Sequence, residues 1–114
     1  MSGSKRAAIL ADLMARYNEQ DVEGYAAFFT ADGCEAAYRG DVLRDGRSGI
    51  VDGYSKVFAE FPENRAEVTA MTEFADQVVV HEKVARSSAA DPFDVLAIYT
   101  FTPDDKIARV EFIR

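Results

Sequence analysis

The spacing of apolar residues changes at Pro62, and this change limits the folds open to the chain. Before Pro62, apolar residues recur every three to four positions, as on one face of a helix. After Pro62, they tend to recur at every second position, as on one face of a strand. Helices that precede strands in this way predict an α+β fold. The length of 114 residues suits a single domain over residues 1–114.

We predict three helices in the first half of the chain. The first carries an apolar stripe from Ile9 to Tyr17, and Ser4 is its expected N-cap. Asp21 is the expected N-cap of a short second helix whose buried face extends to Phe29. The third is expected from about Arg47 to Phe61, with Pro62 ending it and Gly53 permitting close packing. A short strand is expected at 34–39.

Four strands are expected in the second half, over residues 65–74, 78–86, 94–102 and 106–113. The third of these is apolar on both faces, because Val95, Ala97, Tyr99 and Phe101 share one face and Leu96 and Ile98 share the other. A sheet face that is apolar needs a cover, and a second copy of the chain is the cover that we expect in so small a domain. Leu96 and Ile98 are therefore predicted to lie in a homodimer interface.

Charge and cysteine content exclude several classes of function. The chain carries 13 basic and 20 acidic residues, a net charge of −7, which disfavours binding to nucleic acid. With one histidine and one cysteine, Cys34, which we interpret as inert packing, no metal site is expected. The sequence contains no glycine-rich phosphate-binding loop, so no cofactor is expected. Apolar runs are too short for a signal peptide or a membrane span, so a cytoplasmic protein is expected.

Four segments carry a resemblance to a known family. They read RYNEQDVEGYAAFFTADG, DGRSGIVDGYSKVF, VVVHEKVAR and AIYTFTPDDKIARVEFIR. Together they resemble the nuclear transport factor 2-like superfamily, in its SnoaL-like and steroid delta-isomerase-like branch. This resemblance implies a cone-shaped, cystatin-like α+β fold with three N-terminal helices on a curved antiparallel sheet that ends in a four-stranded meander. It also implies an apolar pocket open at one end, dimers formed through the convex face, and steroid, polyketide or terpenoid fragments as substrates.

The catalytic residues of ketosteroid isomerase are not matched. That mechanism uses an aspartate base and two oxyanion donors, a tyrosine and a protonated aspartate. Aligning the resembling segments places these three groups at Leu13, Ala37 and Ala97. A methyl or isobutyl group neither accepts a proton nor stabilises an oxyanion, so this mechanism is predicted to be absent.

The same alignment implies other candidate site residues. Glu82 is expected in the pocket as a desolvated acid or base, with Tyr99 as hydrogen-bond donor and Arg86 as charge stabiliser. Its alternatives are pairing with Arg86 or Arg109, or an exposed position. Strand alternation places His81 on the opposite face, in the dimer interface. The residues expected to bind substrate are Arg86, Tyr38, Tyr54, Phe58, Val84, Phe101 and Phe112.

Three functions remain open on the sequence alone. The first is an enzyme that moves a proton on a small, apolar, oxygenated metabolite, as an isomerase, cyclase, hydratase or dehydratase. The alternative is a non-enzymatic module for small-molecule binding or dimerisation, which the apolar Leu13, Ala37 and Ala97 favour. A protein-recognition domain is the third hypothesis, and it requires an exposed apolar patch.

Overall fold

The computed structural model describes residues 5–114 and contains three helices in that range. Helix α1 spans Lys5–Asn18, α2 spans Val22–Ala26 and α3 spans Gly46–Glu60. The predicted helices are therefore confirmed, with small shifts at their ends. The expected cap at Ser4 lies outside the described residues. Among residues 5–114, each helix is too short or too polar to pass through a lipid bilayer.

The second helix is shorter than predicted. Asp21 caps it as expected, because its side-chain oxygen accepts the Gly24 amide at 2.9 Å. Phe29 does not belong to α2, since it begins strand β1, Phe29–Ala37. The strand expected at 34–39 thus starts five residues earlier and ends two earlier. Strand β2, Val42–Asp45, was not predicted, because four residues are too few to establish an alternating pattern.

The sheet has six strands and is mixed, which corrects the expected fully antiparallel sheet, whereas the expected four-stranded meander is confirmed as β3 to β6. The remaining strands are β3, Arg65–Phe74, β4, Gln77–Ala85, β5, Phe93–Phe101, and β6, Ile107–Ile113. Their spatial order is β2-β1-β6-β5-β4-β3. Strand β1 runs parallel to β6, whereas the other neighbours are antiparallel. A parallel pair joins strands that are distant in sequence, so local patterns did not reveal it.

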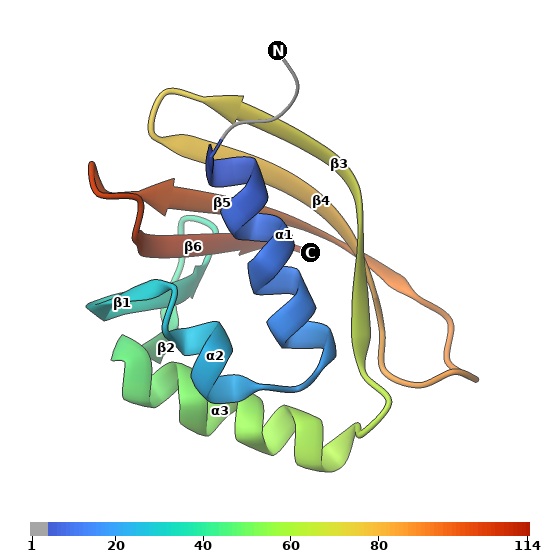
Figure 1. The fold of residues 1–114 in the computed structure, drawn as a ribbon. Coiled ribbons are helices and arrows are strands. Elements are labelled where there is room, and N and C mark those ends of the chain that lie inside the picture. Colours follow the sequence, from blue (N-terminus) through green and yellow to red (C-terminus); the bar gives the residue numbers. More distant parts are fainter. Residues whose placement is uncertain (1–4) are drawn as a thin grey trace.

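The helices pack on one face of the curved sheet, with α1 crossing it and α2 and α3 lying beside β1 and β2 (Figure 1). Strand β5 shows how its alternation builds this core. Val95, Ala97, Tyr99 and Phe101 are buried, whereas Leu96, Ile98 and Thr100 between them are half-buried on the outer face. The chain thus has an α+β architecture with its core between helices and sheet.

Candidate functional site

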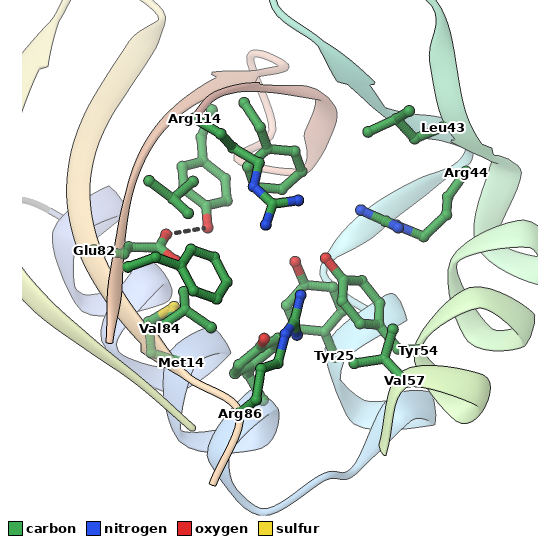
Figure 2. Close-up of a pocket in the computed structure, with 15 residues that line it drawn as sticks. Met14, Tyr25, Leu43, Arg44, Tyr54, Val57, Glu82, Val84, Arg86 and Arg114 are labelled. Atoms are coloured by element: carbon green, nitrogen blue, oxygen red, sulfur yellow. Dashed lines mark hydrogen bonds between the residues drawn. The ribbon is translucent and has the colours of Figure 1, made fainter. Parts of the chain in front are cut away.

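A cavity of about 140 Å³ opens between the inner face of the sheet and the helices (Figure 2). Strands β4, β5 and β6 form one wall, and α1, α2, α3 and β2 form the other. The lining combines aromatic and aliphatic side chains with one carboxylate and three guanidinium groups, the usual composition of a small-molecule site. It consists of Met14, Tyr17, Tyr25, Leu43, Arg44, Tyr54, Val57, Glu82, Val84, Arg86, Phe93, Val95, Tyr99, Phe112 and Arg114.

Glu82 lies on the inner face of β4, between the inward Val80 and Val84. Only 6% of its surface is exposed. The Tyr99 hydroxyl donates a hydrogen bond to its Oε2 at 3.2 Å, drawn as the dashed line in Figure 2. Burial is the main reason that the pKa of Glu82 rises from 4.5 to about 7. The hydrogen bond from Tyr99 lowers this pKa, and the nearby charge of Glu35 raises it further. The carboxyl group therefore changes charge near neutral pH.

His81 points to the opposite face of the sheet from Glu82. Its side chain is 44% exposed, and its Nε2 lies 2.9 Å from Asp94 Oδ1. Lys83 contacts the same carboxylate at 3.0 Å. The hydrogen bond from His81, followed by that from Lys83, lowers the pKa of Asp94. His81 and Glu82 thus serve different faces, although they are neighbours in sequence.

Glu35 on β1 is a second buried carboxylate, and the sequence reasoning missed it. Its side chain is fully buried. It accepts a hydrogen bond from the Tyr25 hydroxyl at 2.7 Å and forms an ion pair with Arg44 Nε. Arg44 in turn lies 4.6 Å above the ring of Tyr54. The signal was present, because Glu35 stands between small apolar residues in a strand, as Glu82 stands among valines.

The backbone of α3 leaves room for this ion pair. A Cβ atom at Gly53 would lie 2.6 Å from Cδ of Arg44. Any larger residue at this position would push the Arg44 side chain away from Glu35. Gly53 therefore supports the expected close packing of α3, here against an arginine of β2.

Arg86 lies at the rim and is held by neutral partners. Its Nη1 donates to Asn64 Oδ1 at 2.8 Å, and the buried Asn64 donates to the Tyr17 hydroxyl at 2.8 Å. Its guanidinium lies 5.2 Å from the centroid of the Phe93 ring. The alternative pairing of Glu82 with Arg86 or Arg109 is wrong, since Arg109 bonds to Glu111 instead.

Tyr54, Val84 and Phe112 line the cavity together with Glu82, Tyr99 and Arg86. Three of the residues expected to bind substrate do not line the cavity, and their positions in the fold explain why. Tyr38 follows the last residue of β1 and is 42% exposed. Phe58 is buried behind Tyr54, whose ring it stacks on at 5.8 Å. Phe101 lies at the far end of β5 beneath Arg6.

The three positions that correspond to the isomerase residues offer no acid or base here. Leu13 and Ala97 are fully buried among apolar neighbours. Ala37 ends β1, whose pairing with β2 is irregular between Glu35 and Ala36. Among residues 5–114, no group of three or more metal-ligating side chains is arranged around a common point.

Solved structures of similar fold extend over almost the whole chain. An uncharacterised cystatin-fold protein from Novosphingobium aromaticivorans is 41% identical, with a TM-score of 0.89, over 98% of this chain and 100% of that one. A putative polyketide cyclase from Sinorhizobium meliloti is 20% identical, with a TM-score of 0.78, over 93% and 94%. The epoxide hydrolase/cyclase-like enzyme SalBIII, described in pyran ring formation in salinomycin, is 22% identical, with a TM-score of 0.81, over 96% and 89%.

The likenesses at 20% and 22% identity show the fold alone. A comparison with curated proteins found no match. The SnoaL-like domain family matches residues 10–110, nearly the whole chain. The resemblance to the SnoaL-like branch of the nuclear transport factor 2-like superfamily is thereby confirmed, and this chain belongs to the SnoaL-like domain family.

Proposed function

We propose that the protein is an enzyme that transfers a proton on a small oxygenated molecule, with Glu82 as the group that accepts and returns it. The observation that carries this proposal is the position of Glu82, a desolvated carboxyl group that lines a cavity. A base is most effective when its pKa lies near the working pH, and the pKa of Glu82 is about 7.

The proposed step begins with a substrate carbonyl in the cavity. The Glu82 carboxylate accepts a proton from the carbon beside the carbonyl, and the electron pair of that C–H bond moves toward the carbonyl oxygen. The resulting enolate is stabilised by nearby positive charge, for which Arg86 is the candidate. Where the substrate carries a β,γ double bond, the enolate is conjugated with it, and return of the proton to the γ carbon moves the double bond and completes an isomerisation. Tyr99 donates to Glu82, so we assign it to positioning the carboxyl group.

The cyclase and epoxide hydrolase/cyclase-like names of two structural neighbours are compatible with acid–base chemistry in a pocket of this fold. They concern other proteins, so the reaction class of this chain depends on its own residues. A buried carboxyl group serves equally as the acid in a cyclisation or a dehydration, and we include both in the proposal.

Deuterium exchange tests proton transfer without knowledge of the product. The protein is incubated in D₂O with small cyclic ketones such as cyclohexanone and cyclohexenone, and deuterium incorporation beside the carbonyl is followed by mass spectrometry. We expect the wild type to accelerate exchange and Glu82→Gln to return it to the background rate. The matched control is Glu73→Gln, which removes an exposed carboxylate from β3.

Equal exchange by the wild type and Glu82→Gln would overturn the proposal. The second candidate function is non-enzymatic binding, favoured by the apolar residues at Leu13, Ala37 and Ala97. Under that function, the cavity would retain a small molecule in native mass spectrometry, and no ketone would exchange faster with the wild type than with Glu82→Gln.

A further inference from the structure

The cavity gathers positive charge although the chain as a whole is acidic. Arg44, Arg86 and Arg114 all direct their guanidinium groups into the same space (Figure 2). Arg44 is neutralised by Glu35. Arg86 and Arg114 form no salt bridge with any carboxylate of residues 5–114. Although the chain has a net charge of −7, two cations of one cavity thus lack a carboxylate partner among the described residues.

Both cations contact the same aromatic ring, which carries no charge. The guanidinium carbons of Arg86 and Arg114 lie 5.2 Å and 4.8 Å from the centroid of the same ring, Phe93. Arg86 is oriented further by Asn64, which is 2% exposed. The amide oxygen of Asn64 occupies one of the five N–H donors of Arg86 and leaves its charge uncompensated. Two guanidinium groups that reach the same cavity without a carboxylate partner suit an anion that accepts several hydrogen bonds, such as a carboxylate.

The size of the cavity limits the rest of the ligand. Its volume is about 140 Å³. For comparison, an engineered protein cavity of about 150 Å³ binds benzene. Apolar side chains, among them Met14, Val84 and Val95, form much of the wall. A cavity of this volume suits a single carbon ring.

We propose that the substrate is a small carboxylic acid with one ring, whose carboxylate binds between Arg86 and Arg114 while its reacting carbon faces Glu82. This inference rests on the proposed function, since it names the class of substrate for the same site. A single ligand of this kind accounts both for the two cations without a carboxylate partner and for the apolar wall of the cavity. Of the substrate classes implied by the family resemblance, a whole steroid would extend beyond a cavity of about 140 Å³.

Binding of simple acids tests the inference. Benzoate and cyclohexanecarboxylate are the probes, and benzamide is the neutral analogue of benzoate. Isothermal titration calorimetry at neutral pH should detect binding of both acids to the wild type and at least tenfold weaker binding of benzamide. Arg86→Gln and Arg114→Gln should each weaken benzoate about tenfold or more and leave the weaker binding of benzamide unchanged.

Two further variants separate the site from general effects. Arg65→Gln removes an exposed arginine of β3, so it changes the net charge by the same amount and should leave the affinity for benzoate unchanged. Arg86→Lys keeps the charge but loses the two-pronged geometry, so it should lie between the wild type and Arg86→Gln. Folding of each variant is verified by thermal unfolding, and a variant that does not fold is replaced by its lysine counterpart.

The inference is overturned if neither acid binds, if benzamide binds as tightly as benzoate, or if Arg65→Gln weakens benzoate as much as Arg86→Gln does. These outcomes differ from failure of the proposed function. Exchange of neutral ketones that depends on Glu82, without binding of the acids, would refute only the carboxylate site. Binding of benzoate that depends on Arg86, without Glu82-dependent exchange of any ketone or bound acid, would refute proton transfer.

Discussion

Replacing Glu82 by Gln should change the way in which stability depends on pH. Burial raises the pKa of this group in the folded protein from 4.5 to about 7. Below pH 4.5 both the folded and the unfolded chain hold the proton, so the group causes no change with pH. Between pH 4.5 and about 7 only the folded chain holds it, so the wild type loses stability as the pH rises.

The loss is complete above the folded pKa and amounts to roughly 3 kcal/mol. Glutamine has nearly the same shape, does not titrate and still offers an oxygen to the Tyr99 hydroxyl. The difference in unfolding free energy between Glu82→Gln and the wild type should therefore grow in favour of the variant by roughly 3 kcal/mol from about pH 5 to about pH 8. Urea unfolding followed by circular dichroism measures it.

The comparison of two proteins at each pH cancels the other titrating groups. The exposed Glu73→Gln serves as the control, and its difference from the wild type should stay constant over the same range. A constant difference for Glu82→Gln as well would refute the reasoning, because it would mean that the carboxylate of Glu82 is solvated in the folded protein. A difference that grows toward low pH would refute it equally.

Three other variants test separate parts of the structure. Tyr99→Phe removes a hydrogen bond that lowers the pKa of Glu82, so the midpoint of the exchange rate against pH should move upward, and a downward shift would contradict this role. Arg44→Met leaves the buried Glu35 without its cation and should cost about 3 kcal/mol in urea unfolding. Adding Glu35→Gln should recover part of that loss, whereas a further loss would argue against the ion pair. For the proposed homodimer, light scattering after gel filtration should show a dimeric wild type and a monomeric Ile98→Asp, and a monomeric wild type would exclude it.

Much of the local structure could be predicted because helices and strands have different periods. The stripe from Ile9 to Tyr17 predicted α1, and the alternation in β5 predicted which of its side chains share a face. The same alternation placed His81 and Glu82 on opposite faces, whereas the family resemblance decided that Glu82 points inward. These properties depend on neighbours a few residues apart, so the amino-acid order contains them.

The buried ion pair of Glu35 and Arg44 was not predicted, because it depends on contacts between segments that are distant in the sequence. Glu35 is buried only because β1 pairs with β6 on one side and β2 on the other. Its cation comes from β2, a strand too short to recognise, and α3 must pass close at Gly53 to hold that arginine in place.

The order of residues alone specified the three helices, the four strands after Pro62 and the alternation of side chains within each of those strands. Only the tertiary structure specified which strands are neighbours, and with it the pairing of Glu35 with Arg44 and the meeting of Arg86 and Arg114 on the ring of Phe93. The physical reason is that periodicity is a property of consecutive residues, whereas charge compensation in a cavity is summed over every segment that reaches it.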